Sequence, residues 1–108
     1  MGIVGPITEY FKPHSSTIKS AFVFGSVAKG TDTASSDIDL MVIGNNLNYA
    51  DLYDAAQNVE RRVCRKVNPL FVSPADWRRK TSEPGSVFSK IRHSPKIFVI
   101  GSERDLRT

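Results

Sequence analysis

Two short apolar segments, each closed by a glycine, flank a polar stretch in the first half of this 108-residue chain. Ile18–Phe24 is rich in β-branched and aromatic residues and ends at Gly25, and Asp37–Ile43 ends at Gly44. Segments of this length and composition, bounded by turn residues, predict buried β-strands. They constrain the fold strongly, because any amphipathic helix near them must then pack against a sheet.

The segments around these two strands predict helices alternating with further short strands. The clearest helix begins at Asn48, with Asp51 in a capping-box-like position, and carries an apolar stripe of Leu52, Ala55, Ala56, Val59 and Val63. The other expected elements are a helix over 2–12, a strand from Pro69 to Val72, helices over 74–80 and 86–93, a strand over 96–100, and a polar tail over 101–108. This order predicts the α/β (α+β) class, with a small mixed sheet of about four strands covered by helices in a single domain over 1–108.

Composition excludes several classes of protein and site. The longest aliphatic or aromatic runs have four residues, such as Ile97–Ile100, whereas a membrane span needs about 20 apolar residues and a signal-peptide core about 7–15. One cysteine and two histidines provide neither an internal disulfide nor a zinc site of the cysteine/histidine type. We therefore expect a cytoplasmic protein without a membrane partner.

The charges are divided unevenly along the chain. Residues 1–60 hold three lysines against seven acidic residues, and residues 61–108 hold twelve lysines and arginines against four acidic residues, within a net charge of +4. The basic second half leaves nucleic acid or a nucleotide open as an anionic partner. The simpler interpretation is that acids early and bases late in the helix over 49–66 complement its macrodipole.

Asp37 and Asp39 are the strongest candidates for chemistry. Side chains alternate along a strand, so both carboxylates point to one side while Ile38, Leu40 and Val42 point to the other. Carboxylates about 6–7 Å apart repel each other unless a cation lies near them. Hard oxygen ligands of this kind suit Mg²⁺ or Mn²⁺ with substrate phosphate completing the shell. A solvated strand end with turn-capping acids is the alternative.

The turn after the first strand offers a place for phosphate. Small residues at Gly25-Ser26 let backbone N–H groups approach an anion, particularly where a helix follows. Lys29 adds a positive charge nearby, as either a phosphate contact or an exposed loop lysine. Ser36 is expected to shape the turn before the second strand and is also a nucleotide-binding candidate.

Gly25-Ser26, ten intervening residues and Asp37-Ile38-Asp39-Leu40 match the glycine-serine…aspartate-x-aspartate signature of the DNA polymerase β-like nucleotidyltransferase superfamily. The string FGSVAKGTDTASSDIDLMVIG, from Phe24 to Gly44, most resembles the minimal nucleotidyltransferase branch. The resemblance covers about 20 residues tightly, and its motif combination is more specific than an isolated short pattern.

The resemblance implies transfer of a nucleoside monophosphate from a nucleoside triphosphate to a hydroxyl of a protein or nucleic acid, with release of pyrophosphate. The expected triphosphate is ATP. It implies that Ser26 and the neighbouring backbone hold the β- and γ-phosphates, and that Asp37 and Asp39 are catalytic ligands of Mg²⁺ or Mn²⁺. It also implies a partner protein, because minimal nucleotidyltransferases often pair as antitoxins with a small helical toxin and related domains accompany DNA-binding regulators.

One position departs from the family pattern. Active members carry a third carboxylate on a later strand, and the matching position here is Asn68. An amide can offer a carbonyl oxygen to a metal, but it carries no charge and cannot accept a proton as a base. Asn68 is therefore a substitute in the third catalytic position, and the alternative function is a catalytically weak or inactive nucleotide-binding or regulatory module.

Three further side-chain placements follow from the sequence. Trp77 is expected to pack inward, against the alternative of a stacking patch beside Arg78 and Arg79. Tyr49 and Tyr53 are expected to be partly buried, and Cys64 to be a small buried apolar residue.

Overall fold

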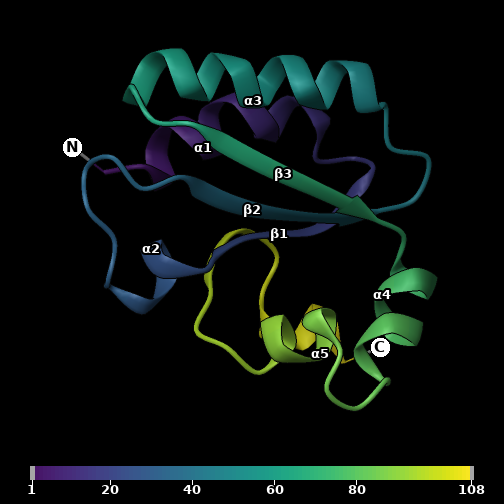
Figure 1. Cartoon of the computed structure of the whole chain (residues 1–108). Helices are drawn as coiled ribbons and strands as arrows, with labels where there is room; N and C mark the ends of the chain where they lie inside the picture. Colours follow the sequence, from purple (N-terminus) through teal and green to yellow (C-terminus); the bar gives the residue numbers. More distant parts are fainter. Residues whose placement is uncertain (1, 108) are drawn as a thin grey trace.

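The computed structural model describes residues 2–107 and places a four-stranded sheet between two layers of helices (Figure 1). The strands are β1 (Ile18–Phe24), β2 (Ile38–Gly44), β3 (Val67–Val72) and β4 (Ile97–Ile100). The helices are α1 (Val4–Phe11), α2 (Ser26–Lys29), α3 (Tyr49–Val63), α4 (Pro74–Thr81) and α5 (Val87–Arg92), with 3₁₀ helices η1 (Lys12–His14) and η2 (Glu103–Leu106). The α/β class with a mixed sheet is confirmed.

The sheet has the order β3-β2-β1-β4. β1 runs antiparallel to both β2 and β4, whereas β2 and β3 are parallel. A parallel pair needs a crossover connection, and α3 supplies it. The sheet is mixed because, among the strands of residues 2–107, β2 and β3 form a parallel pair and the other neighbouring pairs are antiparallel.

Helices α1 and α3 cover one face of the sheet, and α4 and α5 cover the other (Figure 1). Leu40 and Val42 of β2 lie in the core with the apolar stripe of α3, while Met41 and Ile43 lie in the core with Trp77 and Ile91. The strand alternation therefore buries both faces of β2, and only its first residues leave polar groups at the surface.

Helix α3 is held at both ends by its own sequence. Asn48 is its N-cap, and its side chain accepts a hydrogen bond from the Asp51 N–H at 3.1 Å, as the sequence predicts. Near its other end Arg62 forms a 3.0 Å ion pair with Glu9 of α1. A hydrogen bond with Tyr10, followed by the charge of Glu9, raises the pKa of Arg62.

β3 begins two residues earlier than the predicted start at Pro69, at Val67. Proline cannot donate a backbone hydrogen bond to a neighbouring strand, so it is found at the first residue of a strand or within an edge strand. β3 lies at the edge of the sheet, so Pro69 can stand inside the strand. This correction brings Asn68 into the parallel ladder with β2.

Three other expectations are wrong in detail. Tyr49 and Tyr53 are 57% and 50% exposed; they pack beside Phe71 of the edge strand, and no further strand covers them. Cys64 is also exposed, because it adopts φ 57° as the C-cap of α3 and leaves the apolar stripe. The predicted polar tail contains η2, and Leu106 is buried in the core; Thr108 of that tail lies outside the described residues.

Candidate functional site

Asp37 directly precedes β2, and Asp39 is the second residue of that strand. Ile38 and Leu40 are fully buried toward α1 and α3, so the alternation of the strand turns Asp39 to the α4 and α5 side. Asp39 is half-buried and Asp37 is exposed. Asp39 therefore lies opposite the apolar stripe, as expected from the sequence, whereas Asp37 lies just before the strand.

The Gly25-Ser26 turn lies directly beside Asp39. Phe24, the last residue of β1, pairs with Asp39 across the antiparallel ladder, so the chain turns at the position of this carboxylate. Gly25 has φ 73° and ψ −150°, a conformation that is essentially restricted to glycine. A Cβ at this position would lie 2.5 Å from Asp39 Oδ2. Glycine is thus required both by the backbone and by the carboxylate that approaches it.

Ser26 opens the short helix α2, which ends at Lys29. The first N–H groups of a helix have no acceptor within the helix, and they point toward the side from which the chain enters. The Asp39 carboxylate lies beside Gly25, the residue that precedes this helix. The turn therefore places backbone donors and a metal-type ligand next to each other.

Asn68 joins the two aspartates from β3. The parallel register pairs Asn68 with Asp39, so the two side chains share a face of the sheet. Asn68 Nδ2 donates a 3.0 Å hydrogen bond to Asp37 Oδ2. An ionised carboxylate only accepts hydrogen bonds, so this contact occupies the amide nitrogen and leaves Asn68 Oδ1 available.

Lys29 borders a shallow hollow between the Gly25 turn and α5. Sequence reasoning did not include Lys90, a second lysine of this hollow, because α5 follows the motif by more than 40 residues and no local pattern connects them. The residues lining the hollow are Phe24, Gly25, Lys29, Val87, Lys90, Ile91 and Ser94.

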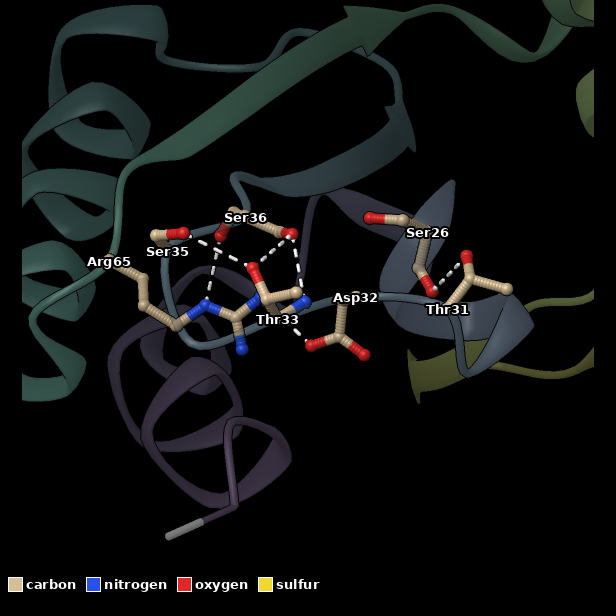
Figure 2. Close-up of polar contacts among 7 residues, drawn as sticks. All are labelled: Ser26, Thr31, Asp32, Thr33, Ser35, Ser36 and Arg65. Atoms are coloured by element: carbon tan, nitrogen blue, oxygen red, sulfur yellow. Dashed lines mark hydrogen bonds and ion pairs between the residues drawn. The ribbon is translucent and has the colours of Figure 1, made fainter.

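Ser36 lies in the loop before β2 and forms hydrogen bonds within that loop (Figure 2). Its Oγ accepts a hydrogen bond from the Thr33 N–H at 2.9 Å and lies 3.3 Å from Thr33 Oγ1. The hydroxyl thus shapes the turn as predicted, and its contact with a nucleotide stays a prediction.

The donor set at this site suits a divalent cation that keeps water or phosphate in its shell. Within residues 2–107, no group of three or more His, Cys, Asp or Glu side chains is placed to hold a metal ion. Two carboxylates and one amide oxygen remain, and all three are hard oxygen donors. Mg²⁺ is typically bound by one or two carboxylates together with substrate phosphates, so the residues fit this ion.

Other candidate sites are less consistent with a ligand. Trp77 is 2% exposed and packs edge-on against Phe22 and Phe88, which confirms the packing interpretation over a stacking surface for bases.

Across residues 2–107, none of the helices has both the length and the apolar character that crossing a membrane requires.

Comparisons with known proteins agree with this geometry. The family model described as "Polymerase beta, Nucleotidyltransferase" matches residues 6–80, a range that contains the turn, both aspartates and Asn68. No curated protein matches the chain.

Several solved structures share the fold at low sequence identity. A toxin–antitoxin with AMP-PNP has 17% identity and a TM-score of 0.63, with 94% of this chain and 76% of that chain covered. The MntA–HepT toxin–antitoxin has 14% identity and a TM-score of 0.57, with coverage of 96% and 74%. The tri-AMPylated Shewanella oneidensis HEPN toxin in complex with MNT antitoxin has 14% identity and a TM-score of 0.57, with coverage of 95% and 73%.

Proposed function

Because the chain belongs to the polymerase beta nucleotidyltransferase family, we propose that it transfers a nucleoside monophosphate from a nucleoside triphosphate to a hydroxyl group. The observation that carries this proposal is the contact between the Gly25 turn and Asp39, where a Cβ would lie 2.5 Å from the carboxylate oxygen. A phosphate held by the turn is then adjacent to a carboxylate that holds its counter-ion. This is the arrangement that phosphoryl-type transfer requires, because it depends on positioning and charge neutralisation.

Each residue has a defined task in this proposal. The backbone at Gly25 and Ser26 binds the terminal phosphates, with Lys29 as an additional positive charge. Asp37 and Asp39 hold Mg²⁺ or Mn²⁺. When bound, the ion neutralises charge on the triphosphate and helps to align its phosphates.

The transfer step forms a bond between the acceptor oxygen and the α-phosphorus, and it breaks the bond from that phosphorus to the bridging oxygen of the leaving pyrophosphate. The acceptor hydroxyl loses its proton in the same step. Asn68 cannot accept this proton because an amide is not a base at neutral pH. The proton must therefore pass to another group, and this proposal gives it to Asp37, the carboxylate in contact with Asn68.

We propose ATP as the nucleotide and a toxin of the HEPN type as the acceptor protein. Both come from solved structures that share the fold, one with AMP-PNP and one with an AMPylated HEPN toxin. The step would attach AMP to a hydroxyl of that toxin. Incubation of this chain with ATP, Mg²⁺ and the product of the neighbouring gene, followed by mass spectrometry, tests for a nucleotide adduct.

A second candidate function is a nucleotide-binding regulatory module with little or no turnover. The hydrogen bond from Asn68 to Asp37 favours this second function. Asn68 stands where active family members carry a third carboxylate, and it donates to Asp37 instead of supplying a charge. Such a module would bind ATP with Mg²⁺, and bind a toxin or a regulator, without forming an adduct.

A pair of double variants tests the site itself. In Asp37→Asn/Asp39→Asn, we expect the affinity for ATP in the presence of Mg²⁺, measured by calorimetry, to fall more than about 100-fold, because even residues behind metal ligands contribute about 10–100-fold. Asp51→Asn/Asp54→Asn is the matched control: it removes the same charge from exposed positions of α3. Retained binding in the first variant, with an unchanged melting temperature, would contradict the proposal.

A further inference from the structure

The loop over residues 30–37 sets the distance between the phosphate turn and the two aspartates, and it contains no helix or strand. Its first residues are tied to α2, because the Thr31 N–H donates to the Ser26 carbonyl at 3.0 Å. Its last residues form a closed turn, in which the Ser36 N–H donates to the Thr33 carbonyl at 3.0 Å. These local bonds shape the two ends of the loop, but they do not fix the loop relative to the sheet.

Arg65 makes that connection (Figure 2). Its Nε donates to the carbonyl oxygen of Ser36 at 3.0 Å, and its terminal nitrogen donates to Asp32 Oδ2, also at 3.0 Å. One guanidinium therefore holds both sides of the loop. The second of these bonds is an ion pair in which the side chains are only 14% and 25% exposed, whereas the Arg62–Glu9 pair is 51% and 59% exposed.

The backbone that carries Arg65 belongs to the same framework as the site. Cys64 ends α3 with φ 57°, and Glu60 Oε1 accepts a 2.9 Å hydrogen bond from the Val67 N–H. The next carbonyl after Arg65, that of Lys66, accepts a 2.8 Å hydrogen bond from the Ile38 N–H. Arg65 is thus anchored where β2 and β3 first pair, three residues before Asn68 of β3 and close to Ile38, which directly follows Asp37.

We propose that Arg65 is a positioning residue for the nucleotidyl transfer proposed above. Its guanidinium fork holds the loop over 30–37 so that Asp37 stays beside Asn68 and in line with Asp39, which lies beside the Gly25 turn. A lysine cannot take this role, because it is a point charge and lacks the rigid fork that reaches two acceptors at once. The inference rests on the proposed function for its effect on nucleotide, but the ordering of the loop can be measured without it.

The contacts distinguish this role from direct phosphate binding. Two of the donor groups of Arg65 are already directed at Ser36 and Asp32, both of which belong to the loop over 30–37. If Arg65 acts through the loop, changing its partner Asp32 must lower the affinity for nucleotide, as changing Arg65 does, because one of the two loop contacts is lost. If Arg65 instead bound phosphate directly, Asp32→Asn would leave the affinity for nucleotide unchanged or increase it, since a negative charge is lost.

The experiment uses Arg65→Lys, Asp32→Asn and the double variant of the full chain, with Arg62→Lys as the matched control in the exposed pair. Amide hydrogen exchange by NMR, without metal or nucleotide, reports on the loop. Binding of Mn²⁺ together with ATP, measured by electron paramagnetic resonance, reports on the site. We expect exchange at residues 32–39 to rise about tenfold or more in the Arg65 and Asp32 variants, because the loop then opens at lower free energy.

We also expect the apparent affinity for Mn²⁺ and ATP to fall about tenfold in either single variant, within the range typical of groups that orient metal ligands. The double variant should lose no more than Arg65→Lys alone, because the contact with Asp32 is already broken in that variant. Arg62→Lys should change neither measurement.

Unchanged exchange at residues 32–39 in Arg65→Lys and Asp32→Asn would overturn the inference. So would increased exchange with unchanged binding, because Arg65 would then stabilise the loop without positioning the site. A wild-type protein that binds no Mn²⁺ with ATP would overturn the proposed function instead. In that case, the change in amide hydrogen exchange at Asp37 and Asp39 between the wild type and Arg65→Lys decides by itself whether Arg65 holds these two residues in place.

Discussion

Asn68 of β3 donates its side-chain amide to Asp37 Oδ2 at 3.0 Å, across the parallel pair of strands. The contact makes the third position of the site a neutral donor to one carboxylate. It stabilises Asp37 without a metal ion, because the amide supplies a hydrogen bond where a third carboxylate would repel. The same contact withholds a base from the reaction.

Asn68→Asp tests this balance. The variant exchanges a hydrogen bond for a like charge next to Asp37, so we expect the free energy of unfolding without metal to fall by about 0.5–1.5 kcal/mol, the net contribution of a typical hydrogen bond. Mg²⁺ should restore the melting temperature, because a cation relieves repulsion between carboxylates. Thermal unfolding with Mg²⁺ and with chelator measures the effect.

The activity of the same variant separates the two candidate functions. A large increase in nucleotide transfer would identify the natural protein as a binder or a slow catalyst. Unchanged transfer would place the base on another residue. Asn68→Ala is the control, since it removes the hydrogen bond without adding a charge, and a melting temperature of Asn68→Asp that ignores Mg²⁺ would contradict the expected geometry.

Gly25→Ala should damage both the backbone and the site. Gly25 has φ 73° and ψ −150°, and strain in sparsely populated backbone regions costs about 1–3 kcal/mol. The new Cβ would also displace the Asp39 carboxylate, so we expect binding of ATP with Mg²⁺ to be lost in calorimetry.

Gly30→Ala is the matched control for Gly25→Ala. Gly30 also has a positive φ of 74°, but no atom lies within 4 Å of its added Cβ. It should lower the free energy of unfolding by about 1–2 kcal/mol and leave nucleotide affinity intact. Equal losses of affinity in the two variants would show that backbone strain alone, and not the contact with Asp39, disturbs the site.

Lys29 of α2 and Lys90 of α5 should contribute to nucleotide affinity from the hollow that they line with Gly25. We expect Lys29→Met and Lys90→Met each to weaken ATP binding about two- to fivefold, the modest effect of exposed charges. The loss should shrink at high salt because such charges are screened. Lys12→Met, which removes an exposed charge in η1, should have no effect; an equal effect there would indicate attraction by net charge alone.

Leu106→Ala tests whether η2 belongs to the core. Leu106 is 4% exposed, and removal of a buried leucine side chain typically costs about 2–5 kcal/mol. Chemical denaturation measures this loss. Leu70→Ala, at a position 43% exposed, should cost less than about 1 kcal/mol. A similarly small loss of unfolding free energy in both variants would show that η2 is a peripheral tail and not part of the core.

The elements with strong local patterns were predictable from the sequence. The apolar run Ile18–Phe24 coincides with β1, and the stripe and Asn48 cap of α3 are found as expected. Alternation along β2 also predicted the face on which Asp39 lies. Local periodicity is informative here because each of these residues follows the pattern that its burial requires.

Side chains at element ends were less predictable, because neighbours distant in the chain decide their exposure. Tyr49 and Tyr53 follow the helical pattern of α3, but they pack beside Phe71 of the edge strand β3 and stay exposed. Leu106 lies in a polar segment, but its burial depends on a core built from β1, β2, α4 and α5.

The sequence by itself determined the order of strands and helices, the glycine-serine turn and the two aspartates on one side of a strand, since these depend on residues close together in the chain. Only the tertiary structure decided which groups meet them. The pairing of β2 with β3 brought Asn68 to Asp37, and the end of α3 brought Arg65 to Asp32. Such contacts join residues more than 30 positions apart, so they arise only when the sheet and its crossover helix have assembled.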